Sequence, residues 1–506
     1  MIKKYSAYLN FPIKLENKEI KSTGAIWSKK PKDVTPEEYK EFYNMMTHQT
    51  SYGSDASYTF HSHFDTSEFS AQVLVYFPSS SVEKLGFQRY DPGLNIYSRK
   101  VLVKKNAPEI CHNWLRFIKG VVDIDSDQIK IHVSRENMQD SHLISQLKEM
   151  IATKVVDFLI RQAAKEPAKY AKWFVLYNEF DVFVKEGIFT TNDEKKKQKL
   201  AKLLRFETNK TKANELISLD EYIQRLKDRT DLNETYKNEI YFVASPTREV
   251  ALRSPYMEAF EEKSLEVLFC NERMDGFVFQ NLRAFENLKF YNIDSNDSVI
   301  AKEKAAQSSN ADSSTDTLTD SECDELSKWI KATFPHQISQ VETTTRLKSH
   351  PAVLVDPQSQ SMRFFMQTMK NYTLPPQRLQ INPKHDIVRG MYKLFKDKDL
   401  DPFKLTQATV IAQQLIHNAF IAAGMIEDAR DILPDINNLM VALLGGKPDT
   451  STLDKKKEQY KDNDNEFDSD SFGATATDTA TTTTDIPQPD ATKDNTQTSK
   501  KDESGK

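Results

Sequence analysis

An arginine stands where a predicted strand meets a predicted helix. Residues 129–134 (IKIHVS) alternate apolar and polar side chains like a half-buried strand, and a helical pattern follows. Arg135 lies at this corner, where side chains project above a sheet, and a guanidinium there suits an anion such as a phosphoryl group. The alternative is a surface arginine that pairs with Glu136 or Asp140.

The sequence supplies no phosphate-binding loop for this arginine. It has 13 glycines in 506 residues, and none recur at G-x-G-x-x-G or G-x-x-x-x-G-K spacing. A backbone cradle for phosphate needs residues that reach unusual dihedral angles and approach the ligand closely. We therefore expect any phosphate that Arg135 contacts to be held by another polypeptide segment, and no nucleotide to bind this chain alone.

Metal and disulfide chemistry are not indicated. His61 and His63 form an H-x-H pair on one face of a predicted strand, but no acidic or sulfur ligand is fixed beside them in sequence. Cys111, Cys270 and Cys323 lie far apart without C-x-x-C spacing. We expect no metal site, no disulfide framework and a reducing compartment.

Composition narrows the class of partner. The formal net charge is -5, with 28% charged residues, which argues against a protein that binds nucleic acid. No apolar run is long enough to span a membrane, and the first residues show no secretory signal.

The elements that would position Arg135 predict an α/β fold. Strand-like runs dominate residues 8–135 and are interrupted by a helix over 35–46, for which Thr35 and Glu38 form a capping box. Residues 140–235 read as helices, one of which is expected to end at Gly187. Residues 239–270 read as a β-α-β unit whose first turn lacks glycine, so a cofactor enzyme built on it is disfavoured.

Two helices near the C-terminus predict self-association. A Ser-, Asp- and Asn-rich stretch, 292–320, reads as a linker, and residues after 446 as a disordered tail, 447–506. Between them, the last two helices cannot bury both faces alone, and a four-helix bundle with a second copy would cover them. The residues assigned to this dimer contact are Ala419, Ala422, Ile432, Ile436, Leu439, Met440 and Leu443.

Several strings resemble the heat shock protein 90 chaperones, in particular their mitochondrial branch, the tumour necrosis factor receptor-associated chaperone. The most specific are WLRFIKGVVD (114–123) and SPYMEAFEEKSLEVLFC (254–270), and the resemblance covers about residues 3–444. It implies a middle domain over 8–291, with an αβα part (8–138), a helical connection (139–235) and a small βαβ part (236–291). An α/β dimerisation domain over 321–446 would follow, whereas the family's N-terminal ATP-binding domain is not recognised.

The resemblance also implies roles for residues. Arg135 matches an arginine that faces the γ-phosphate of ATP and its Mg, and Gln139 matches the glutamine that assists it. His132 replaces the family's asparagine, and the preceding loop is about two residues longer. The positions that match client-contacting residues are Trp27, Met362, Phe365, Met366 and Met369. For these the alternative is ordinary core packing, with Trp27 lying on its own sheet.

The expected function is that of a dimeric, mitochondrial chaperone (otherwise cytoplasmic) that binds unfolded or partly folded clients. Because the chain would hold only the middle-domain part of the ATP hydrolysis site, we expect it to be inactive as an ATPase alone. The alternative is a non-catalytic scaffold or dominant-negative partner that pairs with a full-length relative.

Overall fold

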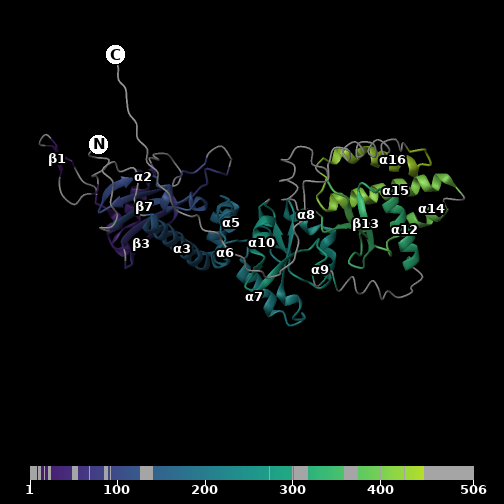
Figure 1. The fold of residues 1–506 in the computed structure, drawn as a ribbon, viewed down its shortest axis with the longest axis horizontal. Helices are drawn as coiled ribbons and strands as arrows, with labels where there is room; N and C mark the ends of the chain where they lie inside the picture. The colour runs from purple at the N-terminus through teal and green to yellow at the C-terminus, as the bar shows by residue number, and fades with distance from the viewer. Residues whose placement is uncertain are drawn as a thin grey trace, which may run out of the picture. The chain divides into compact units, whose positions relative to one another are not determined.

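Within the described residues, the computed structural model holds three sheets of three or more strands, each accompanied by helices (Figure 1). The described residues are Tyr8, 13–15, 18–20, 24–47, 55–84, 89–125, 141–302, 317–357, 374–397 and 401–448, without positions 68, 92, 273, 299, 301 and 427. The predicted disordered tail lies outside them from residue 449 onward.

The first sheet has five strands in the order β3-β4-β7-β5-β6. Its strands are β3 (Ala56–Asp65), β4 (Ser70–Pro78), β5 (Gly93–Ser98), β6 (Val101–Lys104) and β7 (Lys119–Asp125). The central strand, β7, runs parallel to β5 and antiparallel to β4. A short hairpin of β1 (Ile13–Leu15) and β2 (Lys18–Ile20) precedes this sheet in the chain.

A helix packs on each face of this sheet, which confirms the predicted α/β fold. Alternate residues of β7 enter different cores: Val121 joins the core with α2 (Pro36–Thr47), and Val122 the core with α3 (Ser141–Lys165). The period of two along a strand explains this division. The predicted capping box begins α2, because Thr35 N donates to Glu38 Oε2 at 2.9 Å and Glu38 N to Thr35 Oγ1 at 3.2 Å.

Helices follow α3, as predicted, but Gly187 does not end one. They are α4 (Pro167–Ala171), a π-helix (Lys172–Leu176), α5 (Asp181–Thr190), α6 (Glu194–Ala201) and α7 (Leu219–Asp228). Gly187 lies inside α5, and a Cβ added to it would come within 2.9 Å of the Trp114 ring. The glycine is thus explained by close packing and not by a helix end.

The predicted β-α-β unit is confirmed in the second sheet, ordered β11-β12-β9-β10-β8. Strands β9 (Glu239–Ala244) and β10 (Leu268–Cys270) are parallel, and α8 (Arg248–Leu252) and α9 (Glu258–Glu262) lie between them in sequence. The remaining elements are β8 (Glu207–Thr208), α10 (Asp275–Leu282), β11 (Ala284–Phe285) and β12 (Leu288–Asn292).

The predicted linker begins later than residue 292. Ile293 and Ile300 are buried at 0% and 1% exposure in the core of the second sheet, so the chain stays packed up to this point. Composition missed this because the few apolar residues in this polar stretch do not form a recognisable period.

The third sheet is ordered β13-β15-β14 and is accompanied by helices. Its elements are α12 (Asp320–Thr333), β13 (Ile338–Thr343), β14 (Ala352–Val355), β15 (Gln377–Ile381), α14 (Asp386–Lys396), α15 (Pro402–Ala422) and α16 (Leu433–Leu443). Gly445, just after α16, has a φ of 78°, a left-handed conformation that favours glycine at a helix end. Within the described residues, none of the helices has the length and apolar character needed to cross a bilayer.

Candidate functional site at the end of strand β7

Strand β7 leads into the segment that carries Arg135 and Gln139. Both residues lie outside the described part of the chain, as does the predicted strand over 129–134. The described chain reaches Asp125 at the end of the central strand and resumes at Ser141 at the start of α3.

Asp123 is the best-connected polar residue near this strand end. Its Oδ2 accepts a hydrogen bond of 2.8 Å from Trp27 Nε1. The backbone N–H of Lys100, in the turn between β5 and β6, lies 3.2 Å from both carboxylate oxygens. Next to it, Arg99 Nε donates to Asp125 Oδ1 at 2.9 Å. These contacts tie the end of β7 to two other segments, so Asp123 braces this end of the strand.

The buried environment of Asp123 shifts the pKa of its carboxyl group upward. Burial is the largest influence and raises the pKa of this carboxyl group above its ordinary value. The bonds from Trp27 and from the Lys100 backbone act in the opposite direction and only partly offset burial.

Trp27 is a core residue, which corrects its assignment as a client contact. It is 1% exposed, and its ring lies 4.7 Å from Tyr8, 5.6 Å from Phe42 and 4.9 Å from Tyr97, measured between centroids. The alternative of a tryptophan on its own sheet is therefore the one observed. The sequence did not reveal this, because the aromatic partners are distant in the chain: Tyr8 precedes the first sheet, and the others come from α2 and β5.

The two histidines of the H-x-H pair have separate partners. The Nδ1 of His61 lies 2.6 Å from the Tyr39 hydroxyl, and its Nε2 lies 3.0 Å from the Trp27 carbonyl. Burial lowers the pKa of His61. His63 lies 3.1 Å from Asp65. Within the described ranges, no group of three or more His, Cys, Asp or Glu side chains is arranged to hold a metal ion.

The predicted client-binding segment also lies outside the described residues. It contains Met362, Phe365, Met366 and Met369 and joins β14 to β15, which are antiparallel neighbours in the third sheet.

The predicted dimer residues divide into three groups by their exposure. Ala419 and Ile432 are buried within the chain, at 0% and 6% exposure, so their assignment to a dimer contact is corrected to the core. Met440 and Leu443 are 49% and 71% exposed, whereas Ala422, Ile436 and Leu439 are half-buried.

Four further apolar side chains of this region are exposed and were missed from the sequence. They are Ile421, Leu433, Val441 and Leu444, and Leu444 is 88% exposed. Together with Met440 and Leu443 they form what we call the C-terminal apolar set. Leu433 and Met440 lie seven residues apart on one side of α16, and Leu444 follows four residues later, just past the helix end; this spacing indicates a shared side but not whether that side is exposed.

A buried ion cluster joins α5 to α10 and was not anticipated. Lys185 Nζ lies 2.6 Å from Asp181 Oδ2, 2.7 Å from Glu272 Oε2 and 2.7 Å from Asp275 Oδ1. Burial opposes the charge of Lys185, but the carboxylates outweigh it and hold its pKa well above the ordinary value. Only the pair Asp181–Lys185, four residues apart on a helix, was visible in sequence.

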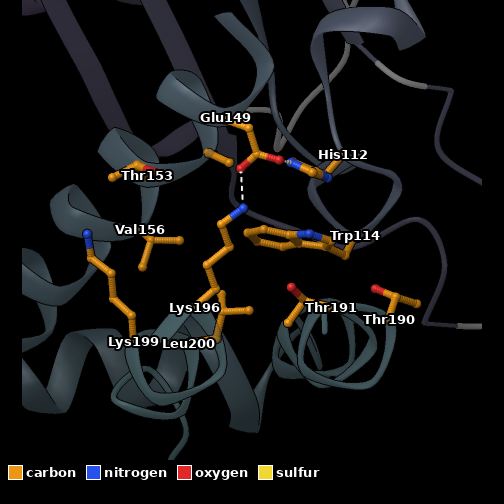
Figure 2. Close-up of a pocket in the computed structure, with 11 residues that line it drawn as sticks. His112, Trp114, Glu149, Thr153, Val156, Thr190, Thr191, Lys196, Lys199 and Leu200 are labelled. Carbon is orange, nitrogen blue, oxygen red and sulfur yellow. Dashed lines mark hydrogen bonds and ion pairs between the residues drawn. The ribbon is translucent and has the colours of Figure 1, made fainter. Parts of the chain in front are cut away.

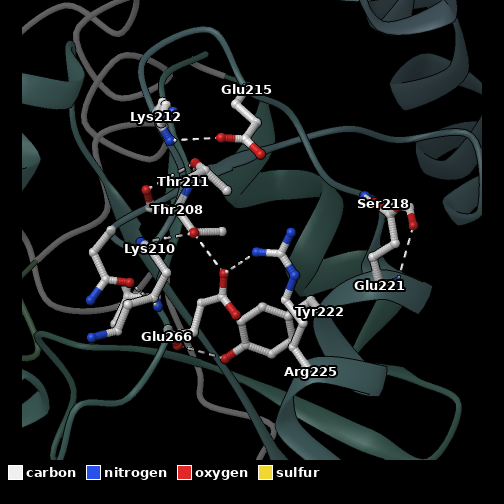
Figure 3. A network of polar contacts seen from close by, with 12 residues as sticks. Thr208, Lys210, Thr211, Lys212, Glu215, Ser218, Glu221, Tyr222, Arg225 and Glu266 are labelled. Atoms are coloured by element: carbon white, nitrogen blue, oxygen red, sulfur yellow. Dashed lines mark hydrogen bonds and ion pairs between the residues drawn. The ribbon is translucent and has the colours of Figure 1, made fainter. Parts of the chain in front are cut away.

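A second polar network joins α7 to the second sheet (Figure 3). Glu266 Oε1 accepts hydrogen bonds from Thr208 Oγ1 at 2.7 Å and from Arg225 at 3.2 Å. The Tyr222 hydroxyl donates to the Glu266 carbonyl oxygen at 2.8 Å. These groups satisfy one another, so we assign the network a structural role.

Comparison with known proteins finds one family over most of the chain. A family described as "Hsp90 protein" matches residues 15–471. The chain is 33% identical to "Chaperone protein HtpG" of Desulfitobacterium hafniense, covering 87% of this chain and 67% of that protein.

Two mitochondrial relatives are similar to the same extent. The chain is 34% identical to "TNF receptor-associated protein 1 homolog, mitochondrial" of Dictyostelium discoideum, over 88% of this chain and 59% of the relative. It is 31% identical to "Heat shock protein 75 kDa, mitochondrial" of Bos taurus, over 88% of this chain and 61% of that relative. The chain thus spans about three fifths of the length of these two proteins.

Proposed function

Because the chain belongs to the Hsp90 protein family, we propose that it is a molecular chaperone that binds unfolded or partly folded client proteins. The observation that carries this proposal is the family match over residues 15–471. The similarity to a bacterial protein whose name is that of a chaperone supports it.

The client-binding surface is proposed to include the segment between β14 and β15. Methionine and phenylalanine side chains adapt to many apolar sequences, because thioethers are flexible and polarizable. In this proposal Met362, Phe365, Met366 and Met369 contact clients.

Arg135 and Gln139 are the residues through which the chain is proposed to contribute to ATP hydrolysis. Their position after β7, whose end is held by Asp123, supports this assignment. Among the described glycines, only Gly424 and Gly445 have positive φ, and both follow helices near the C-terminus. In this proposal the nucleotide itself is bound by another polypeptide segment.

Dimerisation is proposed to occur through the C-terminal apolar set. Six exposed apolar side chains on two helices are unfavourable in water, and a second copy of the chain would cover them. Sedimentation velocity tests this. We expect the parent to sediment as a dimer and the double variant Met440→Ser, Leu444→Ser as a monomer.

A matched control separates this effect from a general loss of apolar surface. Leu252→Ser removes a leucine that is 40% exposed on α8, and it should leave the dimer intact. A monomeric parent, or a dimer that survives the double substitution, would contradict the assignment.

Aggregation assays test the chaperone function. We expect the parent to suppress light scattering by a thermally unfolding model protein, and the double variant Phe365→Ser, Met366→Ser to lose most of this protection. The control Phe189→Ser removes a phenylalanine that is 51% exposed on α5 and should protect as the parent does. A parent that gives no protection but co-purifies with a longer relative would favour the scaffold alternative.

The proposed location is the mitochondrion. Support comes from two relatives whose names include that compartment. Immunostaining of the untagged endogenous protein together with a mitochondrial marker would test this.

A further inference from the structure

Positive charge is concentrated in the helical part of the chain, residues 141–205, which includes α3 to α6. This part holds 13 basic and 8 acidic residues. Residues 13–125 and 320–448 are close to neutral, with 15 basic and 14 acidic residues each, and residues 206–300 have 12 basic and 18 acidic ones. An anionic group is therefore attracted to the helical part more than to the other three.

Three of these cations lie on one side of α3. Lys154, Arg161 and Lys165 are exposed, and they follow one another at seven- and four-residue spacing, which places them on the same side of the helix. At 1.5 Å per residue they extend over about 16 Å. We call these three residues the cationic side of α3.

The acidic residues of α3 are already paired with other lysines. Figure 2 shows Glu149 with the amine of Lys196, 2.7 Å away. Asp157 lies 2.6 Å from Lys199, and Glu166, directly after the helix, is paired in the same way with a lysine. Among the residues that the structure describes, none forms an ion pair with the cationic side of α3. Its three charges are thus available to an anionic group from elsewhere.

The chain itself contains an acidic segment with a matching repeat. In residues 462–470 (DNDNEFDSD) every second position is acidic. In an extended backbone alternate side chains point to the same side, so five carboxylates would line one side over about 26 Å. This row is long enough to cover the roughly 16 Å of the cationic side of α3.

The acidic segment is attached to the described part of the chain by a long connection. Thirteen residues separate position 448, the last one described, from residue 462, and they can extend over up to about 45 Å. Attachment gives the segment a higher effective concentration than a free anion has. We propose that residues 462–470 bind along the cationic side of α3 of the same chain and so keep other anionic groups from it.

Carbodiimide cross-linking of the full chain, followed by mass spectrometry, tests the proposal. The reagent joins carboxylates to amines that touch them, so we expect links within single chains from residues 462–470 to Lys154 and Lys165. In 1 M NaCl, where the Debye length is about 3 Å, the yield should fall at least about fivefold. Links found only to other lysines, or only in products of doubled mass, would overturn the proposal.

Charge reversal tests the same contact without a cross-linker. Ser471→Cys adds a labelling position next to the acidic segment, and Cys111, Cys270 and Cys323 are buried. A dye at position 471 should show high fluorescence anisotropy at low salt. The triple variant Lys154→Glu, Arg161→Glu, Lys165→Glu should lower the anisotropy to the value measured in 1 M NaCl.

A matched control changes the net charge by the same amount in the acidic part of the chain. Lys210, Lys212 and Lys227 are exposed, and replacing all three by glutamate should leave the anisotropy high. Circular dichroism of both triple variants would show that they are folded.

Exchanging the charges provides a rescue that a structural defect in α3 would not allow. Adding Asp464→Lys, Glu466→Lys and Asp468→Lys to the α3 variant should restore the high anisotropy. The proposal is overturned by equal anisotropy in parent and α3 variant, by an equal effect of the control variant, or by a failed rescue. Retention of the parent on phosphatidylglycerol vesicles through the cationic side, with low anisotropy of the dye, would assign this side to a membrane surface instead.

Discussion

The indole Nε1 of Trp27 donates a 2.8 Å hydrogen bond to Oδ2 of Asp123, 96 positions further along the chain. The bond is buried and connects the segment before α2 to the central strand of the first sheet. It lies two residues before Asp125, the last residue of β7, so it holds this end of the strand in place.

Removing this bond should cost stability. Trp27→Phe keeps an aromatic ring but removes the donor, and hydrogen bonds to charged groups contribute about 1.5–3 kcal/mol. In a double-mutant cycle with Asp123→Ala, urea denaturation should give a coupling free energy in this range. The cycle of Trp329→Phe with Asp123→Ala is the control and should show no coupling. A Trp27 cycle without coupling would mean that the bond contributes nothing.

Lys185→Met should be among the most destabilising single substitutions in the chain. It leaves the carboxylates of Asp181 and Asp275 buried without their cation, and removing one partner of a buried ion pair costs about 3–5 kcal/mol. Guanidinium denaturation measures the effect. Lys40→Met breaks an exposed pair with Asp55 and should change stability by less than about 1 kcal/mol. Equal effects of the two substitutions would be inconsistent with this interpretation.

The same cluster should make stability depend on pH. Burial is the largest influence and raises the pKa of Asp181 from 3.8 to about 7, with Glu272 and Asp275 adding to it and Lys185 opposing it. The folded chain therefore binds more protons than the unfolded chain between these values. The free energy of unfolding should accordingly fall as pH rises through this window, by up to about 1.4 kcal/mol per pH unit. Asp181→Asn should flatten that slope, and identical slopes for variant and parent would refute the assignment.

Gly187→Ala should destabilise the protein although alanine normally favours a helix. The new Cβ would come within 2.9 Å of the Trp114 ring and 3.3 Å of Leu200, and such overpacking costs about 1–3 kcal/mol. Gly390→Ala is the matched control within α14, where nothing lies within 4 Å of the added Cβ. There the substitution should stabilise by about 1 kcal/mol. Thermal unfolding of both variants would show whether the two effects have opposite signs.

Local patterns in the sequence were sufficient for several elements. The capping box of Thr35 and Glu38 involves residues three apart, and the β-α-β unit over 239–270 shows a change of hydrophobic period. The prediction of a helix end at Gly187 was wrong because it also used only the local pattern. A glycine late in a helical pattern resembles a helix end, and the local sequence does not show the distant Trp114 ring that packs against it.

The sequence by itself determined the α/β fold class, the family and the apolar helical pair at the C-terminus, because each depends on residue types at short, regular spacing. Only the tertiary structure decided that Trp27 is core, that Lys185 is enclosed by carboxylates from two helices and the loop before the second, and which side of α16 is exposed. These facts depend on contacts between residues far apart in the chain. Burial and pairing across such distances follow from packing and not from periodicity.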